Sequence, residues 1–290
     1  MTAMCPVCGS TASDLLWPAR LPQALTASEF SYTGNKRHHG QVLRCTRCGH
    51  RFVHPRPPEL AAFYSDVTDP FYVATETERV RTFEEFLDCK ERYCHGRGSL
   101  LDVGCYAGVF LDVAARRGYA VEGLELSRWA AGIARGRGHQ VREGSVEVLE
   151  DIPQRYDTIT AFDVLEHLAD PVSAARTIRS RLVPDGCFVA TVPDMGSWHA
   201  RLLGRRHWLV VTMHMQYFTR ETLQRMLTAA GFSRVTITSA PPYRMRVADA
   251  AAYSNANAAL RVPFALLKHL PGINQLEIRL KASLFAVAHP

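Results

Sequence analysis

The sequence predicts an α/β protein in which a doubly wound parallel sheet follows a small metal-binding module. Two observations carry this prediction. From residue 99 onward, short apolar runs alternate with amphipathic segments, at the spacing of strands and helices in a parallel sheet. Residues 1–58 are instead rich in Cys, Gly, Pro, Arg and His and show little sustained periodicity. With 290 residues, 47% of them hydrophobic, the chain can build one sizeable core and a small accessory module.

Each element of the predicted sheet has its own signal in the sequence. Apolar runs predict strands at 99–103, 119–126, 139–144, 156–165, 187–193 and 233–240. Amphipathic segments predict helices at 108–118, 127–138, 170–186 and 221–232. Gly118 and Gly231 are placed to end two of these helices, and Ser127 is placed to cap the start of a third.

The chain therefore divides into four expected parts. Residues 1–58 form the module, which closes on a rigid proline-rich stretch, and residues 59–98 form a linker with a helix near 75–93. Residues 99–240 form the doubly wound domain. Residues 241–290 form an extension that completes a ligand pocket, packs on the domain or makes a dimer contact, and the sequence leaves these roles open.

Composition and charge exclude some classes of protein. No apolar run reaches the roughly 18 residues of a membrane span, and the first residues lack the pattern of a secretory signal, so a cytoplasmic protein is expected. The formal net charge of +6 would suit an anionic partner. The arginines are mostly scattered, which favours reading them as ordinary surface cations.

Two Cys-x-x-Cys pairs predict a zinc site in the module. Cys5 and Cys8 form one pair, Cys45 and Cys48 form the other, and a glycine follows each pair. Each tight turn directs two sulfurs toward one tetrahedral ion, and two such turns complete a four-thiolate shell. A closed shell has no open coordination position, so the predicted Zn²⁺ is structural.

The other cysteines and the nearby histidines are given no such role. The four remaining cysteines are isolated in the sequence (Cys89, Cys94, Cys105 and Cys187), and the arrangement of all eight argues against disulfides. Three histidines near the Cys pairs are interpreted as solvated loop residues rather than as ligands (His38, His39 and His50).

The segment 100–111 follows the pattern of a nucleotide-binding turn. An apolar strand leads into Asp102, and Gly104 and Gly108 allow a sharp bend before the next helix. Asp102 would repel a pyrophosphate, so it favours a ligand that carries a cationic amino group. Glu125 ends the next strand, where a carboxylate can accept both hydroxyls of a ribose. The two acids together are far more specific than either one alone.

These residues, with later ones, resemble the successive motifs of class I S-adenosylmethionine (SAM)-dependent methyltransferases. The matching stretches are 102–108, Glu125, 162–168 with 170–171, 182–186, 214–223 and 229–232. The N-terminal Cys pairs resemble a subgroup in which a Cys-x-x-Cys module precedes the methyltransferase domain. The resemblance covers nearly all of residues 1–240, and it implies a Rossmann-like fold with SAM as the cofactor.

The resemblance also implies a role for each matching residue. Asp102, Gly104 and Gly108 would line the methionine end of SAM, and Glu125 would hold its ribose. Three further residues would lie near the adenine or the methyl group: Ser145 and Val146 beside the adenine, and Asp163 beside the methyl. Two departures affect details, because Tyr106 makes the turn bulkier, and Ser145 replaces the Asp that binds adenine in many members.

His167 is the leading candidate for a catalytic base, and His214 is the second. Methyl transfer from a sulfonium requires an aligned acceptor and, for a hydroxyl acceptor, removal of its proton. His167 follows the fourth expected strand, at the edge where parallel sheets bind ligands. For both histidines the alternative is a structural role, such as bonding a backbone carbonyl. Glu166 is interpreted as a structural hydrogen-bond partner.

The acceptor is less well defined than the cofactor. A small molecule, anionic or sugar-containing, is favoured, with O-methylation ahead of N- or C-methylation. Five arginines in the module keep an RNA methyltransferase as an alternative (Arg37, Arg44, Arg47, Arg51 and Arg56), although the catalytic region lacks a motif for a flipped base. The segment 196–211 is either a lid over the acceptor or an amphipathic packing helix. A homodimer and a non-enzymatic binding protein also stay open.

Overall fold

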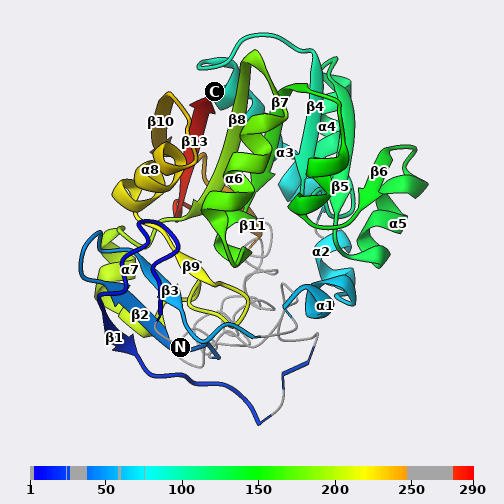
Figure 1. Ribbon diagram of the computed structural model, residues 1–290. Helices are drawn as coiled ribbons and strands as arrows, with labels where there is room; N and C mark the ends of the chain where they lie inside the picture. Colours follow the sequence, from blue (N-terminus) through cyan, green and yellow to red (C-terminus); the bar gives the residue numbers. More distant parts are fainter. Residues whose placement is uncertain (1–2, 24, 27–37, 58–59, 75, 247–276) are drawn as a thin grey trace.

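The computed structural model describes residues 3–23, 25–26, 38–57, 60–74, 76–246 and 277–290. Its main feature is a seven-stranded sheet in the order β10-β13-β8-β7-β4-β5-β6. The strands are β4 (Ser99–Val103), β5 (Ala120–Glu125), β6 (Gln140–Glu143), β7 (Tyr156–Phe162), β8 (Leu182–Pro193), β10 (Arg234–Ser239) and β13 (Ser283–His289). The pairs among β6, β5, β4, β7 and β8 are parallel, and β13 is antiparallel to both of its neighbours. The doubly wound, Rossmann-like α/β prediction is confirmed (Figure 1).

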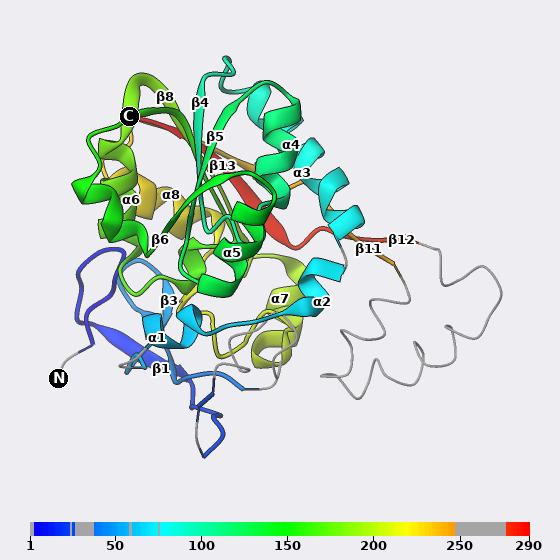
Figure 2. The same ribbon diagram turned by 90° about the vertical axis from the view of Figure 1, so that its right-hand side faces the viewer.

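Helices cover both faces of this sheet because alternate strand residues point to opposite sides. Along β8, Cys187 and Val189 pack with α3 (Glu76–Glu91) and α4 (Val109–Arg116), whereas Phe188 and Ala190 pack with α6 (Pro171–Ser180) and α8 (Arg220–Ala229). Figure 2 shows these two pairs of helices on opposite sides of the sheet. The remaining long helix, α5 (Arg128–Gly136), packs beside β6 and begins at Ser127, whose side chain accepts a hydrogen bond from the Ala130 amide as predicted.

The N-terminal residues form a second, smaller sheet in the order β1-β2-β3-β9. Its strands are β1 (Ser13–Trp17), β2 (Val42–Cys45), β3 (Arg51–Val53) and β9 (Gln216–Tyr217). Because β9 comes from the segment before α8, the module is joined to the large domain by strand pairing. Figure 1 shows the small sheet below the large one.

Several short elements complete the described part of the chain. The linker forms α1 (Leu60–Ser65) and α2 (Pro70–Ala74), and the segment 196–211 forms α7 (Trp198–Leu203) followed by the 3₁₀ turn η4 (Gly204–Arg206). Two further 3₁₀ turns follow sheet strands, η2 (Val146–Asp151) and η3 (Leu165–His167). Among the described residues, no helix combines the length and the apolar character that a membrane crossing requires.

The C-terminal segment contributes a strand that the sequence analysis did not anticipate. β13 lies between β10 and β8, and most of its residues are buried. β11 (Tyr243–Arg246) and β12 (Glu277–Leu280) form a two-stranded ribbon at the start and end of the same extension. Residues 247–276 of this extension and Arg37 lie outside the described residues.

Candidate active site

The turn between β4 and α4 needs both of its glycines. Gly104 has φ 77° and Gly108 has φ 81°, a left-handed conformation that costs other residues energy. A Cβ atom on Gly104 would lie 2.7 Å from Cγ2 of Val164, and one on Gly108 would lie 3.0 Å from Cβ of Ala134. The glycines therefore let the turn pack against the β7–η3 segment on one side and α5 on the other.

Asp102 lies at the end of β4 with a side chain that is almost fully buried. Its carboxyl accepts a hydrogen bond from the Thr160 hydroxyl on the neighbouring strand, at 2.6 Å. Burial raises the pKa of Asp102 to about 8, the Thr160 bond opposes this change, and nearby Glu125 adds to it. The carboxyl is therefore largely protonated at pH 7, and a cationic ligand would favour its ionised form.

Glu125 ends β5 and is held by backbone amides. Its two carboxylate oxygens accept hydrogen bonds from the Tyr106 amide at 2.8 Å and the Ser127 amide at 2.7 Å. Burial raises the pKa of Glu125, and these amide bonds oppose the rise. Each carboxylate oxygen has a further lone pair, so the group can still accept hydroxyl donors from a ligand.

A pocket lies directly over this turn. Its lining comes from β4, the turn, α4, the end of β7 and the linker: Tyr72, Phe83, Asp102, Gly104, Cys105, Tyr106, Ala107, Val109, Phe110 and Phe162. Tyr72 of α2 stacks edge-on against Tyr106 at a centroid distance of 4.5 Å, and the guanidinium of Arg79 lies 3.6 Å from the Tyr72 ring centre. Sequence reasoning missed the linker's part in this wall, because nothing local to 59–98 marks it. A glycine-lined turn with two buried carboxyls fits a nucleoside that carries a cationic amino group.

The two residues expected near the adenine lie next along this edge of the sheet. Ser145 and Val146 follow β6, which pairs with β5, and they begin η2. Val146 is buried, and the Ser145 hydroxyl donates to the carboxylate of Glu147. The Ser145 side chain is thus already engaged by a neighbour in the same turn.

Asp163 follows β7 with a left-handed backbone, at φ 54°. Its carboxyl accepts hydrogen bonds from the Thr191 hydroxyl at 2.9 Å and from the Tyr243 hydroxyl. Burial raises the pKa of Asp163, and both hydroxyl bonds oppose the rise. Sequence reasoning missed Tyr243, which reaches this carboxyl from 80 residues away.

His167 and His214 lie together beyond the end of β7. Their rings are 4.9 Å apart between centroids, and Nδ1 of each faces a backbone carbonyl. For His167 the carbonyl is that of Met213 at 3.0 Å, and the Tyr64 hydroxyl lies 2.7 Å from the same nitrogen. For His214 it is the carbonyl of Leu209 at 2.8 Å. A carbonyl oxygen can only accept, so Nδ1 carries the proton in both rings, and in the neutral form the lone pair is on Nε2.

Glu166 does not have the partner that the sequence analysis expected. Its side chain is 1% exposed, and neither carboxylate oxygen has a hydrogen-bond partner among the described residues. Burial raises its pKa well above the usual range, and the nearby Asp163 adds to the rise. The prediction of a structural hydrogen-bonding side chain is therefore wrong, whereas the Glu166 backbone carbonyl accepts a hydrogen bond from the Met215 amide at 2.7 Å.

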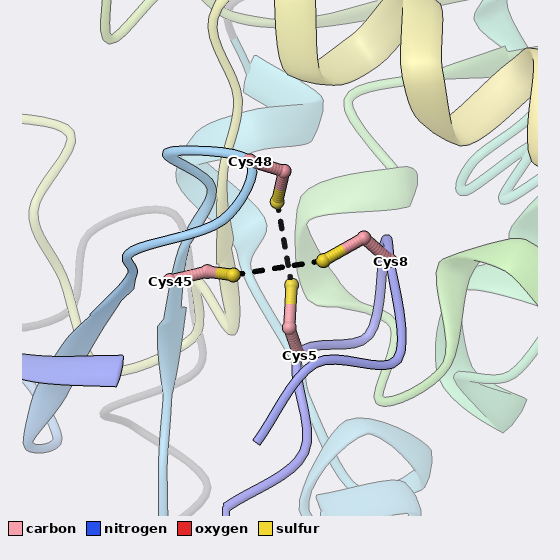
Figure 3. Close-up of side chains that lie close together, drawn as sticks. All are labelled: Cys5, Cys8, Cys45 and Cys48. Carbon is pink, nitrogen blue, oxygen red and sulfur yellow. Dashed lines mark hydrogen bonds between the residues drawn. The ribbon is translucent and has the colours of Figure 1, made fainter. Parts of the chain in front are cut away.

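The four module cysteines come together as predicted (Figure 3). Sγ of Cys5 lies 3.6 Å from Sγ of Cys48, and Sγ of Cys8 lies 3.6 Å from Sγ of Cys45. A tetrahedral ion with Zn–S bonds of about 2.3 Å would separate its sulfurs by roughly 3.8 Å, so this donor set fits Zn²⁺ closely. Burial raises the pKa of Cys48 to about 11. Burial also acts to raise the pKa of Cys45, but hydrogen bonds from backbone amides and from the thiols of Cys8 and Cys48 together outweigh it and lower that pKa to about 7.

Two expectations about the surrounding residues are wrong. His39 and His50 are buried rather than solvated, and Nε2 of His50 lies 2.9 Å from the side-chain oxygen of Gln216 across the boundary between module and domain. Cys94 and Cys187 form a disulfide, which the isolated sequence positions did not reveal. The contacts of His50 and Cys187 are non-local, and residue spacing carries no information about them.

Comparison with known proteins identifies the family and supports the fold. Residues 76–237, more than half of the chain, match the family described as "Methyltransferase domain". The "Ubiquinone biosynthesis O-methyltransferase" of Aeromonas salmonicida is 28% identical over 148 residues, which cover 46% of this chain and 61% of the relative. The protein of the same name from Paracidovorax citrulli is 38% identical over 98 residues, which cover 31% of this chain and 41% of the relative. The chain thus spans about half the length of these curated relatives.

Solved structures agree on the fold. A SAM-dependent methyltransferase from Archaeoglobus fulgidus superposes with a TM-score of 0.53 at 18% identity, covering 77% of this chain and 100% of the other. The plantazolicin methyltransferase BpumL in complex with S-adenosylhomocysteine (SAH) superposes with a TM-score of 0.52 at 13% identity, covering 79% and 93%. From the family match over more than half of its length and the fold that carries it, this chain belongs to the methyltransferase domain family.

Proposed function

We propose that the protein transfers the methyl group of SAM to a hydroxyl oxygen of a small-molecule acceptor, at the carboxyl ends of β4, β5 and β7. One observation carries the proposal. The turn that follows β4 lies beside the buried carboxyls at the ends of β4 and β5, and it packs through Gly104 against Val164, three residues before the candidate base His167. Cofactor turn and base thus share one edge of the sheet, which is where parallel sheets bind ligands.

The cofactor roles follow from this geometry. Asp102 would pair with the ammonium of the methionine part, and Glu125 would accept the ribose hydroxyls with its remaining lone pairs. Gly104 and Gly108 would let the backbone approach the ligand. Ser145 and Val146 would lie beside the adenine. Asp163 would lie at the end of β7 beside the methyl group, and the hydroxyl groups of Thr191 and Tyr243 hold its carboxyl in place.

For this reaction the protein needs to align the acceptor with the methyl group and to supply a base for the hydroxyl proton. SAM supplies a methyl group already activated on a sulfonium. The acceptor oxygen forms a bond to the methyl carbon while the carbon–sulfur bond breaks and leaves its electron pair on sulfur. When no metal ion is bound to His167, the hydroxyl proton passes to Nε2 of this ring, because its Nδ1 already donates to the Met213 carbonyl. His214 is the second candidate for this role.

The acceptor class is inferred from the relatives and from surface charge. The curated relatives are named as O-methyltransferases of ubiquinone biosynthesis, which supports oxygen as the methylated atom and a small molecule as the acceptor. Three exposed arginines on α7 and η4 support an acceptor with an anionic or sugar-phosphate group (Arg201, Arg205 and Arg206). N- and C-methylation of a metabolite are the alternatives, and the test below separates them.

The test uses SAM labelled with ¹³C in its methyl group and a panel of catechols, phenols and sugar nucleotides. NMR of the product distinguishes methyl groups on oxygen, nitrogen and carbon. We expect an O-methyl signal in the product. The His167→Gln substitution should lower kcat about 10²- to 10⁴-fold. The control His95→Asn, which removes an exposed histidine outside the site, should leave kcat unchanged. An N-methyl or C-methyl product would refute the proposed oxygen transfer.

We also propose that the Cys cluster holds one structural Zn²⁺. The four sulfurs fill a tetrahedral shell and leave no open position for a reactant. Cys45→Ser should lower the zinc content measured by mass spectrometry and lower the melting temperature, whereas Cys89→Ser, which changes a cysteine outside the cluster, should leave the zinc content unchanged. Equal zinc contents in the two variants would contradict this assignment.

Nucleic-acid binding is the second candidate function, and exposed arginines on the module favour it. Arg44, Arg47 and Arg56 are exposed close to the Cys pairs. If they grip RNA, affinity for an RNA hairpin should fall steeply as salt rises, and Arg44→Ala with Arg47→Ala should reduce that slope. Weak binding with a flat salt dependence would dismiss this alternative.

A homodimer is supported by an exposed apolar patch on α7. Trp198 is 76% exposed and Leu202 is 77% exposed. Sedimentation velocity of the wild type and of Trp198→Ala tests whether this patch joins two copies. A monomer in both samples would remove the dimer from the account.

A further inference from the structure

Three metal-ligating side chains meet just beyond the end of β7. Glu166 and His167 come from η3, and His214 comes from the segment before β9. One ligand atom from each of the three lies within 4.8 Å of the others. The Met215 amide, which donates to the Glu166 carbonyl at 2.7 Å, holds the two segments together. The cluster is thus built by two separate stretches of chain that the fold fixes against each other.

Both histidines are oriented as metal-binding histidines usually are. In such residues one ring nitrogen binds the ion, and the other donates its proton to a carbonyl or carboxylate. Nδ1 of His167 faces the Met213 carbonyl at 3.0 Å, and Nδ1 of His214 faces the Leu209 carbonyl at 2.8 Å. The Tyr64 hydroxyl donates to the same Met213 carbonyl at 3.0 Å, so it can accept from Nδ1 of His167. These bonds fix Nε2 as the nitrogen that presents a lone pair in each ring.

Glu166 supplies the second, independent observation. Its side chain is 1% exposed, yet neither carboxylate oxygen has a hydrogen-bond partner among the described residues. Burial of an unpaired carboxyl costs several kcal/mol if it is ionised, and a protonated carboxyl would still leave a donor unsatisfied. A cation between Glu166 and the two imidazoles would pair with the ionised carboxylate and leave no unsatisfied donor.

We infer that Glu166, His167 and His214 bind a divalent transition-metal ion, with Zn²⁺ as the representative. Two imidazoles and one carboxylate suit zinc and its first-row neighbours better than Mg²⁺, which prefers oxygen ligands and water. A tetrahedral ion with bonds of about 2.0–2.1 Å separates its ligand atoms by roughly 3.3–3.4 Å, so small side-chain rotations bring the trio into range. Three protein ligands leave a position open, unlike the closed shell of the Cys cluster.

The open position gives this ion a role in the proposed reaction, and the inference rests on that proposed function. A hydroxyl bound to Zn²⁺ loses its proton far more readily than a free one. The acceptor oxygen would bind the ion, its proton would leave to solvent, and the resulting oxyanion would form the bond to the methyl carbon. With the ion bound, Nε2 of His167 is a ligand and no longer a base. Metal binding and base catalysis by His167 therefore use one lone pair and exclude each other.

The experiment measures metal binding directly, so that it does not depend on an acceptor. Full-length protein is stripped of loosely bound metal, titrated with Zn²⁺ and analysed by mass spectrometry of the metal content. We expect two ions per chain in the wild type and in the control His95→Asn, and one ion in Glu166→Gln and in His214→Gln. Co²⁺ substitution separates the two sites, because the Cys cluster gives thiolate-to-cobalt charge-transfer bands and the trio gives only weak visible bands.

A milder variant keeps the inference testable if a buried substitution unfolds the protein. Tyr64→Phe removes only the hydroxyl that lies 2.7 Å from Nδ1 of His167. Such outer-shell losses weaken metal binding about 10- to 100-fold, and we expect this for the second ion alone. One ion per chain in the wild type, with no response to Glu166→Gln, His214→Gln or Tyr64→Phe, would overturn the inference. SAH affinity measured on the same samples reports separately on the proposed function.

Discussion

Replacing Asp102 with Asn removes the charge at the proposed ammonium site and preserves the shape of the side chain. The Asn oxygen can still accept the Thr160 hydroxyl bond that Asp102 accepts at 2.6 Å, so the fold should tolerate the change. Because burial raises the pKa of Asp102 to about 8, most of this carboxyl is protonated at pH 7 without ligand. SAH binding should ionise it, so most of one proton should be released for each ligand bound.

Calorimetry in buffers of different ionisation enthalpy measures this proton release. We expect it in the wild type and in Asp185→Asn, an exposed control, and we expect Asp102→Asn to lose it. At pH 8.5, where most of the Asp102 carboxyl is already ionised, loss of a charge-assisted bond worth about 1.5–3 kcal/mol should raise the Kd for SAH about 10- to 150-fold. Equal proton release in the three proteins, or a change in Kd below about threefold, would refute the assignment of Asp102.

Two further predictions concern the turn and a buried histidine. Gly104→Ala and Gly118→Ala both place a side chain at a positive φ, but only at Gly104 would the new Cβ meet Val164, at 2.7 Å. Chemical denaturation should therefore show Gly104→Ala to be less stable than Gly118→Ala by about 1–3 kcal/mol, and equal stabilities would contradict the packing argument. Burial lowers the pKa of His207 to about 4, so between pH 6.5 and pH 4 the unfolded chain binds a proton that the folded chain does not. His207 should contribute about 3 kcal/mol to the loss of stability as the pH drops through this window, so His207→Gln should show a shallower slope than the wild type, and an equal slope would contradict this role for His207.

The parts of the site that the sequence predicted are those encoded by local pattern. A strand, a glycine turn and a helix occur in succession, so the parallel sheet predicts that Asp102 at the end of the strand lies beside Gly104 and Gly108 of the turn. Glu125 follows at the end of the adjacent strand by the same rule. The Cys pairs were equally readable, because two Cys-x-x-Cys turns have few uses other than a shared metal.

The parts that the sequence did not reveal depend on contacts between distant segments. β13 is a buried apolar run like several others, and its place between β10 and β8 follows from antiparallel pairing across more than 40 residues. Tyr243 reaches Asp163 and Tyr64 reaches His167 from elements whose own sequence gives no sign of these contacts. The neighbouring sequence likewise does not show whether a polar side chain is buried, so the buried environments of His50 and Glu166 could not be predicted from it.

A crystal structure of the protein with SAH tests the central claim most directly. The account predicts SAH in the pocket over the β4–α4 turn, with its ammonium beside Asp102, its ribose hydroxyls within hydrogen-bond distance of Glu125, and its sulfur facing the β7 end near His167. SAH bound elsewhere on the chain, or bound in this pocket with the ribose away from Glu125, would contradict the cofactor site proposed for this methyltransferase.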